Sequence, residues 1–151
     1  KSRVGHVFMK QALAEHNAVF GGEFSGHFYF KKNFNADSGA IAFAAVVSGL
    51  AASNKSMSEL IAPAKRYTQS GEINFETDDK EAAMDDLRRA YPKAKTDTLD
   101  GITVDMGSWW CNVRASNTEP LLRLNLEGPD RKTVDALVKE AAQYPGKRDA
   151  H

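Results

Sequence analysis

The chain of 151 residues carries 20 Lys and Arg against 20 Asp and Glu, so its formal net charge is zero, and 42% of its residues are hydrophobic. A neutral chain lacks the broad positive field that attracts nucleic acid or an anionic membrane, and no apolar run is long enough to cross a bilayer, so we expect neither partner. The single cysteine, Cys111, excludes an internal disulfide, which fits a reducing compartment, and we expect a cytoplasmic location.

The first part of the chain is expected to mix helices with short strands. Apolar residues at Val4, Val7, Phe8 and Leu13 follow helical spacing and predict a helix over residues 4–15. Short apolar runs predict strands at residues 18–20 and 28–30. The chain opens on Lys1 rather than Met and shows no signal-peptide pattern, so we expect a piece of a longer protein.

Two further helices are predicted before residue 66. Asp37 or Ser38 is a suitable N-cap for a helix over residues 39–52, and Ser56 for a short helix that runs to residue 64. The first of these helices is almost entirely apolar, which predicts that it is deeply buried. Residues 1–66 are therefore expected to form one domain, followed by a polar hinge at residues 67–71.

Residues 72–151 predict an antiparallel sheet with two helices on one face. A helix begins near Asp78 or Asp79 and ends near Tyr91, and a second one begins near Asp130 and ends at Pro145-Gly146. The strands are expected at residues 72–76, 96–99, 102–106, 109–114 and 121–127.

The segment Gly-Gly-Glu-Phe-Ser-Gly-His, residues 21–27, stands between two of the predicted strands. A turn needs one or two glycines and a small polar residue, but it does not need a carboxylate, a hydroxyl and an imidazole together. The composition of this segment therefore indicates a binding loop.

A second polar loop, Arg-Ala-Ser-Asn-Thr-Glu-Pro, occupies residues 114–120. Strand alternation places Arg114 and Arg123 on the face opposite to the apolar residues of their strands. Two guanidinium groups and the donors of Ser116, Asn117 and Thr118 suit a phosphate dianion. From the pattern alone, an ordinary surface turn is the simpler alternative.

Taken together, the two loops resemble those of the α-D-phosphohexomutases. The first is similar to the sugar-recognition loop of that family, and the second, followed by Leu-Leu-Arg-Leu-Asn-Leu-Glu, is similar to its phosphate-binding loop. The segment Ser-Gly-Glu-Ile-Asn at residues 70–74 resembles the phosphomannomutase and phosphoglucomutase branch. The resemblance covers nearly the whole chain, with both motifs in the order of the family.

This resemblance implies an α/β remnant of the third mutase domain followed by an α+β C-terminal domain, similar to the TATA-binding protein. It implies an enzyme that interconverts hexose 1-phosphate and hexose 6-phosphate through a bisphosphorylated sugar, with mannose or glucose as the hexose. A phosphoserine and a Mg²⁺ loop serve the chemistry in the family. Neither motif is found in this sequence, so we expect no metal site in the chain and no activity from it alone.

The resemblance also assigns roles to individual residues. Glu23 and Ser25 match positions that hydrogen-bond sugar hydroxyls, and Gly22 and Gly26 leave room for the ring. His27 completes that motif. His6 matches a histidine expected beside the sugar, and these two histidines are the candidates for a catalytic role.

The phosphate loop is carried over in the same way onto Arg114, Ser116, Asn117 and Thr118, with Arg123 as a supporting residue. The implied partners are a phosphosugar, the remaining domains of the same enzyme, and glucose or mannose 1,6-bisphosphate as activator. Two alternatives stay open: a phosphoglucosamine mutase, which usually carries Gly-Thr at positions 117–118, and a non-catalytic sugar-phosphate-binding module that shares only the family's shape.

Overall fold

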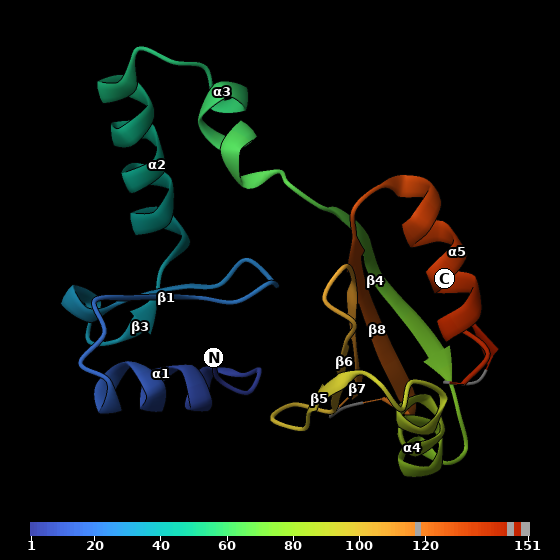
Figure 1. Ribbon diagram of the computed structural model, residues 1–151. Coiled ribbons are helices and arrows are strands. Elements are labelled where there is room, and N and C mark those ends of the chain that lie inside the picture. Colours follow the sequence, from blue (N-terminus) through green and yellow to red (C-terminus); the bar gives the residue numbers. More distant parts are fainter. Residues whose placement is uncertain (117–118, 145–146, 149–151) are drawn as a thin grey trace. The chain divides into compact units, whose positions relative to one another are not determined.

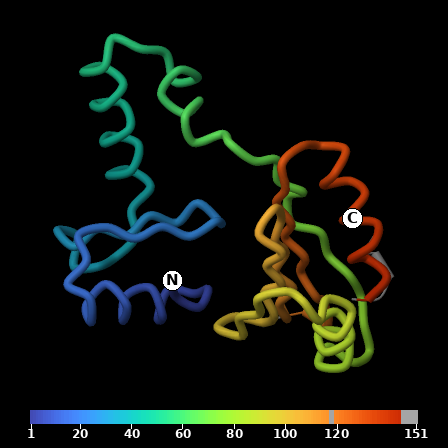
Figure 2. The backbone as a smooth tube through the Cα atoms, in the orientation of Figure 1, coloured from blue at the N-terminus to red at the C-terminus, as the bar shows by residue number. Residues whose placement is uncertain are grey.

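The computed structural model describes residues 1–116, 119–144 and 147–148. The chain divides into two compact units, Lys1–Ala64 and Lys65–His151. Figure 1 shows the elements of each unit and Figure 2 the path of the backbone. The candidate binding loops fall in different units, one in each.

The first unit begins with a helix packed on a small sheet. Helix α1 (His6–Glu15) is followed by the strands β1 (Phe20–Gly22), β2 (Phe28–Phe30) and β3 (Ala36–Asp37), with a 3₁₀ turn η1 (Lys31–Asn33) before β3. Among the described residues these strands pair antiparallel in the order β1-β2-β3. The helix lies directly on β1, because a Cβ atom added at Gly21 would come within 2.8 Å of the side chains of Leu13 and Met9.

Two expected boundaries differ from the structure in this unit. The helix begins at His6 rather than at residue 4, because Gly5 has a φ of 129°, a conformation outside the helical region. The first strand was expected at residues 18–20, which is wrong: the pairing with Tyr29 and Phe28 draws Gly21 and Gly22 into the ladder. The strand at residues 28–30 is confirmed.

Both helices predicted after the sheet are present (Figure 1). The hydroxyl of Ser38 accepts a hydrogen bond from the Ile41 N–H and caps α2 (Gly39–Ser53). Ser56 and Glu59 form a capping box at α3 (Met57–Ile61), which continues into a 3₁₀ turn η2 (Ala62–Ala64).

The expected deep burial of the first of these helices is wrong. None of the residues of α2, all of which the structure describes, is buried, and Phe43 and Val46 expose 72% and 51% of their surface. An apolar helix is buried only where another element packs against it, and composition does not say whether that element is present. Among the described residues no single helix is long and apolar enough to cross a membrane; α2 and the α3–η2 segment pass that test only as a pair bent by 100°.

The second unit is a sheet with two helices. Its elements are β4 (Thr68–Glu76), α4 (Lys80–Ala90), β5 (Lys95–Asp97), β6 (Ile102–Asp105), β7 (Trp110–Ala115), β8 (Leu121–Gly128), α5 (Arg131–Ala141) and β9 (Lys147–Arg148). Within the described ranges the strand order is β5-β6-β7-β8-β4-β9, and neighbouring strands pair antiparallel. Asp79 and Asp130 cap the two helices, as the sequence predicts.

Both helices pack on the same face of the sheet, so the predicted architecture is confirmed. Leu87 of α4 and Val134 of α5 belong to the same buried cluster as alternate residues of the strands. That cluster also holds Ile73, Phe75, Ile102, Val104, Cys111, Val113, Leu122, Leu124 and Leu126. The opposite face of the sheet carries mainly polar residues, together with the apolar Trp110 and Leu121.

Three details of this unit were not predicted. Residues Thr68–Gly71 belong to β4, with a bulge between Gln69 and Glu72, so the segment expected as an irregular hinge is mostly strand, and its role as a hinge stays a prediction. The edge strand β9 was missed. Helix α5 ends at Ala141, and the expected end at Pro145-Gly146 lies outside the described residues.

The buried cluster gives a direct test of the second unit. Leu87 is 0% exposed, so Leu87→Ala should lower the free energy of unfolding by about 2–5 kcal/mol through lost burial and a cavity. Leu99→Ala is the matched control, because Leu99 is 44% exposed and its loss should cost less than about 0.5 kcal/mol. Both tryptophans lie in this unit, so urea unfolding followed by tryptophan fluorescence reports it. Equal destabilisation by the two variants would contradict this core.

Cys111 provides an independent test at the same place. Burial on the core face of β7 raises the pKa of its thiol to about 12. Because the thiolate is the reactive form, the native chain should resist a thiol reagent at about pH 8 and react fully in urea. Rapid labelling of the native chain at that pH, measured by absorbance of the released reagent, would contradict the burial of Cys111.

Candidate functional site

The polar residues of the first unit gather around the hairpin that joins β1 to β2. The hairpin is closed by the Glu23 N–H, which donates to the His27 carbonyl at 2.9 Å, and by the Gly26 N–H, which donates to the Glu23 carbonyl at 3.0 Å. Gly26 has a φ of 84°, a region that glycine enters without strain. This turn presents the side chains of Glu23, Ser25 and His27 from one short segment.

The centre of this group is Tyr29, a fully buried residue of β2. Its hydroxyl lies 2.7 Å from His6 Nδ1 and 2.5 Å from Glu23 Oε1. The other oxygen of Glu23 accepts a hydrogen bond from the Gly5 N–H at 3.2 Å. Burial, followed by the neighbouring Glu23 carboxylate, raises the pKa of Tyr29, so its hydroxyl keeps its proton throughout the physiological range.

The two histidines lie next to each other. Their ring centroids are 5.1 Å apart in an edge-to-face arrangement, and His27 Nδ1 lies 2.8 Å from the Ser25 hydroxyl. Asp37 of β3 adds a carboxylate, with Oδ1 at 3.7 Å from His6 Nδ1. His6, Glu23, Ser25 and His27, predicted from the sequence, are thus in one neighbourhood of the first unit.

The remaining predicted residues of this loop are backbone positions. Gly22 pairs with Phe28 in the ladder and Gly26 forms the turn. The sequence reasoning missed Tyr29 and Asp37. Their position depends on the register between strands, which local sequence does not report. Tyr29 and Asp37 are direct partners in the β2–β3 ladder, and this pairing brings Asp37 beside the predicted site.

One group of side chains in the described residues has the spacing of a metal site. The ligand atoms of His6, His27 and Asp37 lie within 4.8 Å of one another. Two imidazoles and one carboxylate suit zinc or a similar transition metal, whereas Mg²⁺ requires oxygen ligands. This group therefore does not fit the Mg²⁺ that the family resemblance implies, and the magnesium chemistry is not assigned to these residues.

In the second unit, two arginines lie side by side on adjacent strands of the sheet. Arg114 of β7 and Arg123 of β8 are direct partners in the ladder, on the face away from the buried cluster. Glu72 of β4 lies between them, with Oε2 at 3.2 Å from Arg114 Nη2 and Oε1 at 3.4 Å from Arg123 Nη1. Like charges placed opposite one another repel, so this single carboxylate stabilises the pair.

The surroundings of the arginines are polar and incompletely paired. Glu119 contacts Arg123 Nη2 at 3.1 Å, which makes the four charges sum to zero. The Arg114 and Arg123 side chains are 17% and 27% exposed, so both remain accessible to a ligand. Three buried polar atoms have no hydrogen-bond partner among the described residues on these strands: Arg123 Nε, Asn74 Oδ1 and Asn125 Oδ1.

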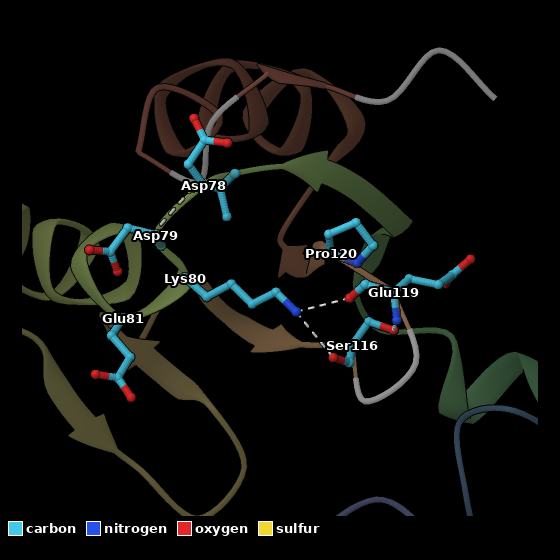
Figure 3. A pocket seen from close by; sticks show the side chains of 8 residues that line it. Asp78, Asp79, Lys80, Glu81, Ser116, Glu119 and Pro120 are labelled. Carbon is cyan, nitrogen blue, oxygen red and sulfur yellow. Dashed lines mark hydrogen bonds between the residues drawn. The ribbon is translucent and has the colours of Figure 1, made fainter.

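A shallow groove of about 560 Å³ lies between the start of α4 and the residues Ser116, Glu119 and Pro120 of the predicted phosphate loop. Figure 3 shows Lys80 reaching across it to Ser116 and Glu119. Its Nζ donates to the Glu119 carbonyl at 2.9 Å and to the Ser116 carbonyl at 3.3 Å. The Ser116 hydroxyl in turn accepts from the Glu119 N–H at 3.3 Å. Lys80 therefore connects the start of α4 to both Ser116 and Glu119.

Of the residues predicted from the sequence, Arg114 and Arg123 are partners in the ladder, whereas the buried Ser116 lines the groove, which neither arginine lines. Asn117 and Thr118 lie outside the described residues. The sequence reasoning missed Glu72, Lys80 and Glu119. Glu72 stands in the segment at residues 70–74 that resembles the family, but its partners depend on the pairing after a strand bulge. Lys80 is the first residue of a helix, and nothing in its local sequence indicates a contact with Ser116 or Glu119.

Two family models match the chain in order. The model described as phosphoglucomutase/phosphomannomutase alpha/beta/alpha domain III matches residues 1–67, and the model of the C-terminal domain matches residues 72–143. The chain belongs to the phosphoglucomutase/phosphomannomutase family. The predicted resemblance and the predicted fold class are therefore confirmed.

Curated relatives of this chain agree with the family assignment. A phosphomannomutase of Methanocaldococcus jannaschii is 43% identical over 150 residues, which cover 99% of this chain and 33% of that protein. A phosphomannomutase of Escherichia coli is 38% identical over 143 residues, 92% of this chain and 31% of that protein. The chain spans about a third of the length of these curated relatives.

A solved structure of a phosphoglucomutase/phosphomannomutase family protein from Burkholderia thailandensis has the same fold. It matches this chain with a TM-score of 0.77 and 26% sequence identity. The match covers 93% of this chain and 30% of that protein. Both units thus correspond to part of a larger protein structure.

Glu72 gives a test of the charge balance around the two arginines. Glu72→Gln keeps the shape of the side chain and removes one of the two negative charges that balance the arginines, so the chain should bind inorganic phosphate about 3- to 10-fold more tightly at low salt. Glu76→Gln is the matched control, since Glu76 lies on the same strand and is exposed. Calorimetric titration measures both. Weaker binding by Glu72→Gln would show instead that Glu72 is needed to orient the arginines.

Proposed function

We propose that the intact protein is a mutase that interconverts hexose 1-phosphate and hexose 6-phosphate through a bisphosphorylated sugar, with mannose or glucose as the hexose. In this proposal the chain supplies recognition of the sugar and of one phosphate group. The observation that carries the proposal is the pair of neighbouring arginines, Arg114 and Arg123, whose guanidinium groups share the carboxylate of Glu72. Arg114 is also the first residue of the predicted phosphate loop. The names of the phosphomannomutase relatives supply the reaction class.

The arginine pair is suited to hold the phosphate that does not react. A guanidinium group donates two parallel hydrogen bonds to a phosphate, and two such groups can bind a dianion. These contacts reach only phosphate oxygens, so they do not distinguish a phosphate on carbon 1 from one on carbon 6. A mutase requires this property, because its substrate must bind in two opposite orientations.

The Glu23 hairpin is suited to hold the sugar ring. The carboxylate already has a donor on each oxygen, Tyr29 and the Gly5 N–H, so its direction is set before a ligand arrives. Its remaining lone pairs can accept hydrogen bonds from two neighbouring hydroxyl groups. The 3- and 4-hydroxyls suit this role, since they occupy nearly equivalent places in the two orientations of the sugar. Binding of this kind positions the substrate for phosphoryl transfer.

The reacting parts of the enzyme are assigned to segments outside this chain. The sequence contains no segment that resembles the family's phosphoserine loop or its aspartate-rich metal loop. We therefore expect the phosphoserine, the Mg²⁺ and the response to a hexose 1,6-bisphosphate activator to depend on the remaining domains, in a cytoplasmic enzyme. The chain by itself should bind phosphosugars weakly and should not catalyse the transfer.

Titration of the 151-residue chain with mannose 1-phosphate and mannose 6-phosphate tests the proposal. Both ligands should bind with similar affinity, since the phosphate site is expected to be indifferent to the carbon. Arg114→Ala should weaken the binding of both ligands about tenfold or more. Arg114→Lys should keep only part of the wild-type affinity, because an ammonium group cannot bind phosphate bidentately. The matched control is Arg88→Ala, on the exposed face of α4. Unchanged binding in Arg114→Ala would overturn the assignment of this site.

A further inference from the structure

The hydrogen bonds of Tyr29 assign a proton that neither the sequence nor the family match reveals. We propose that Tyr29 is a positioning residue: it links Glu23 to His6, keeps the proton of neutral His6 on Nδ1, and leaves Nε2 as the ring nitrogen that can accept a proton from a sugar hydroxyl. The functional half of this statement rests on the proposed function of the Glu23 hairpin. The proton assignment itself rests only on the contacts of these three side chains.

The assignment begins at Glu23. An ionised carboxylate only accepts hydrogen bonds, and both of its oxygens are engaged: Oε2 by the Gly5 N–H and Oε1 by Tyr29 at 2.5 Å. Because the carboxylate has no proton to give, the proton between Glu23 and Tyr29 must belong to the tyrosine hydroxyl. Tyr29 therefore donates to Glu23.

The number of protons on the Tyr29 hydroxyl then determines which nitrogen of His6 is protonated. A tyrosine hydroxyl carries one proton, and Tyr29 has used it on Glu23, so its oxygen can only accept from His6 Nδ1 at 2.7 Å. The hydrogen between these two atoms must be carried by the imidazole. In the neutral ring, a proton on Nδ1 leaves the lone pair on Nε2.

Two further observations support this arrangement. Asp37 Oδ1 lies 3.7 Å from His6 Nδ1, so its negative charge also favours a proton on that nitrogen. Tyr29 is 0% exposed and lies in the central strand of the small sheet, so water does not compete for its hydroxyl. The buried hydroxyl of Tyr29 therefore fixes the direction of both hydrogen bonds, to Glu23 and from His6.

His27 has no comparable constraint. Its Nδ1 contacts the hydroxyl of Ser25 at 2.8 Å, and a serine hydroxyl can either donate or accept. The neighbouring ring thus provides an internal control within the same site. A change at Tyr29 should alter the tautomer of His6 and leave that of His27 as it was.

The donor order runs from His6 to Tyr29 to Glu23, and Nε2 of His6 is left as an acceptor. The residue proposed to bind the sugar and the histidine beside it are in this way linked through one buried hydroxyl.

The test is the tautomer of His6 in the ¹⁵N-labelled 151-residue chain, read from long-range ¹H–¹⁵N spectra at a pH where the rings are neutral. The signals are assigned by their loss in His6→Gln and in His27→Gln. The wild-type chain should show His6 protonated on Nδ1. Tyr29→Phe should shift His6 toward the Nε2-protonated form and leave the His27 pattern unchanged. Asp37→Asn should leave His6 protonated on Nδ1.

Several results would overturn the assignment. An Nε2-protonated His6 in the wild-type chain would do so without any variant, so the test does not depend on how well Tyr29→Phe folds. An unchanged His6 pattern in a folded Tyr29→Phe chain, with dispersed amide signals, would also do so. A shift in Asp37→Asn but not in Tyr29→Phe would give the role to Asp37.

The functional half is tested in the intact enzyme. Tyr29→Phe should lower kcat about tenfold, because a proton on Nε2 of His6 would remove the proton acceptor. The variant should change KM less than about twofold, since Glu23 keeps its hydrogen bond from the Gly5 N–H. A rise in KM with unchanged kcat would show that Tyr29 only supports sugar binding. If the spectra show the expected tautomers while no phosphosugar binds the chain, the proposed function fails and the proton assignment stands.

Discussion

The two-residue alternation of β7 and β8 is the constraint on which the second unit depends. It sends Cys111, Val113, Leu122, Leu124 and Leu126 into one buried cluster beneath the helices and leaves Arg114 and Arg123 opposite each other on the other face. The same ladder that forms the core therefore brings two positive charges together. A shift of one residue in the pairing would bury the arginines and expose the core, so the site and the stability of the unit depend on one register.

Both units place a carboxylate where its two oxygens hold two different partners. Glu72 contacts both arginines, whereas Glu23 accepts from Tyr29 and from the Gly5 N–H. In each case the acceptor holds polar groups in a set geometry before any ligand is present. Such preorganisation reduces the cost of ordering side chains when a ligand binds.

Much of the secondary structure follows from local signals. Ser38, Asp79 and Asp130 cap helices as their positions predict, and the alternating apolar residues of the last strands face the core. Local signals do not report what an element packs against, which is why α2 was wrongly expected to be buried. They also do not report pairing, which is why β1 was placed too early and β9 was missed.

The order of helices and strands, the apolar face of the sheet in the second unit and the two polar loops all follow from local sequence, because spacing, caps and turn residues act over a few neighbouring positions. The side chains that complete those loops come from distant segments. Tyr29 reaches His6 across 23 residues, Glu72 reaches Arg114 across 42, and Lys80 reaches Ser116 across 36. Contacts between segments so far apart depend on strand register and helix packing, which no local pattern of residues encodes.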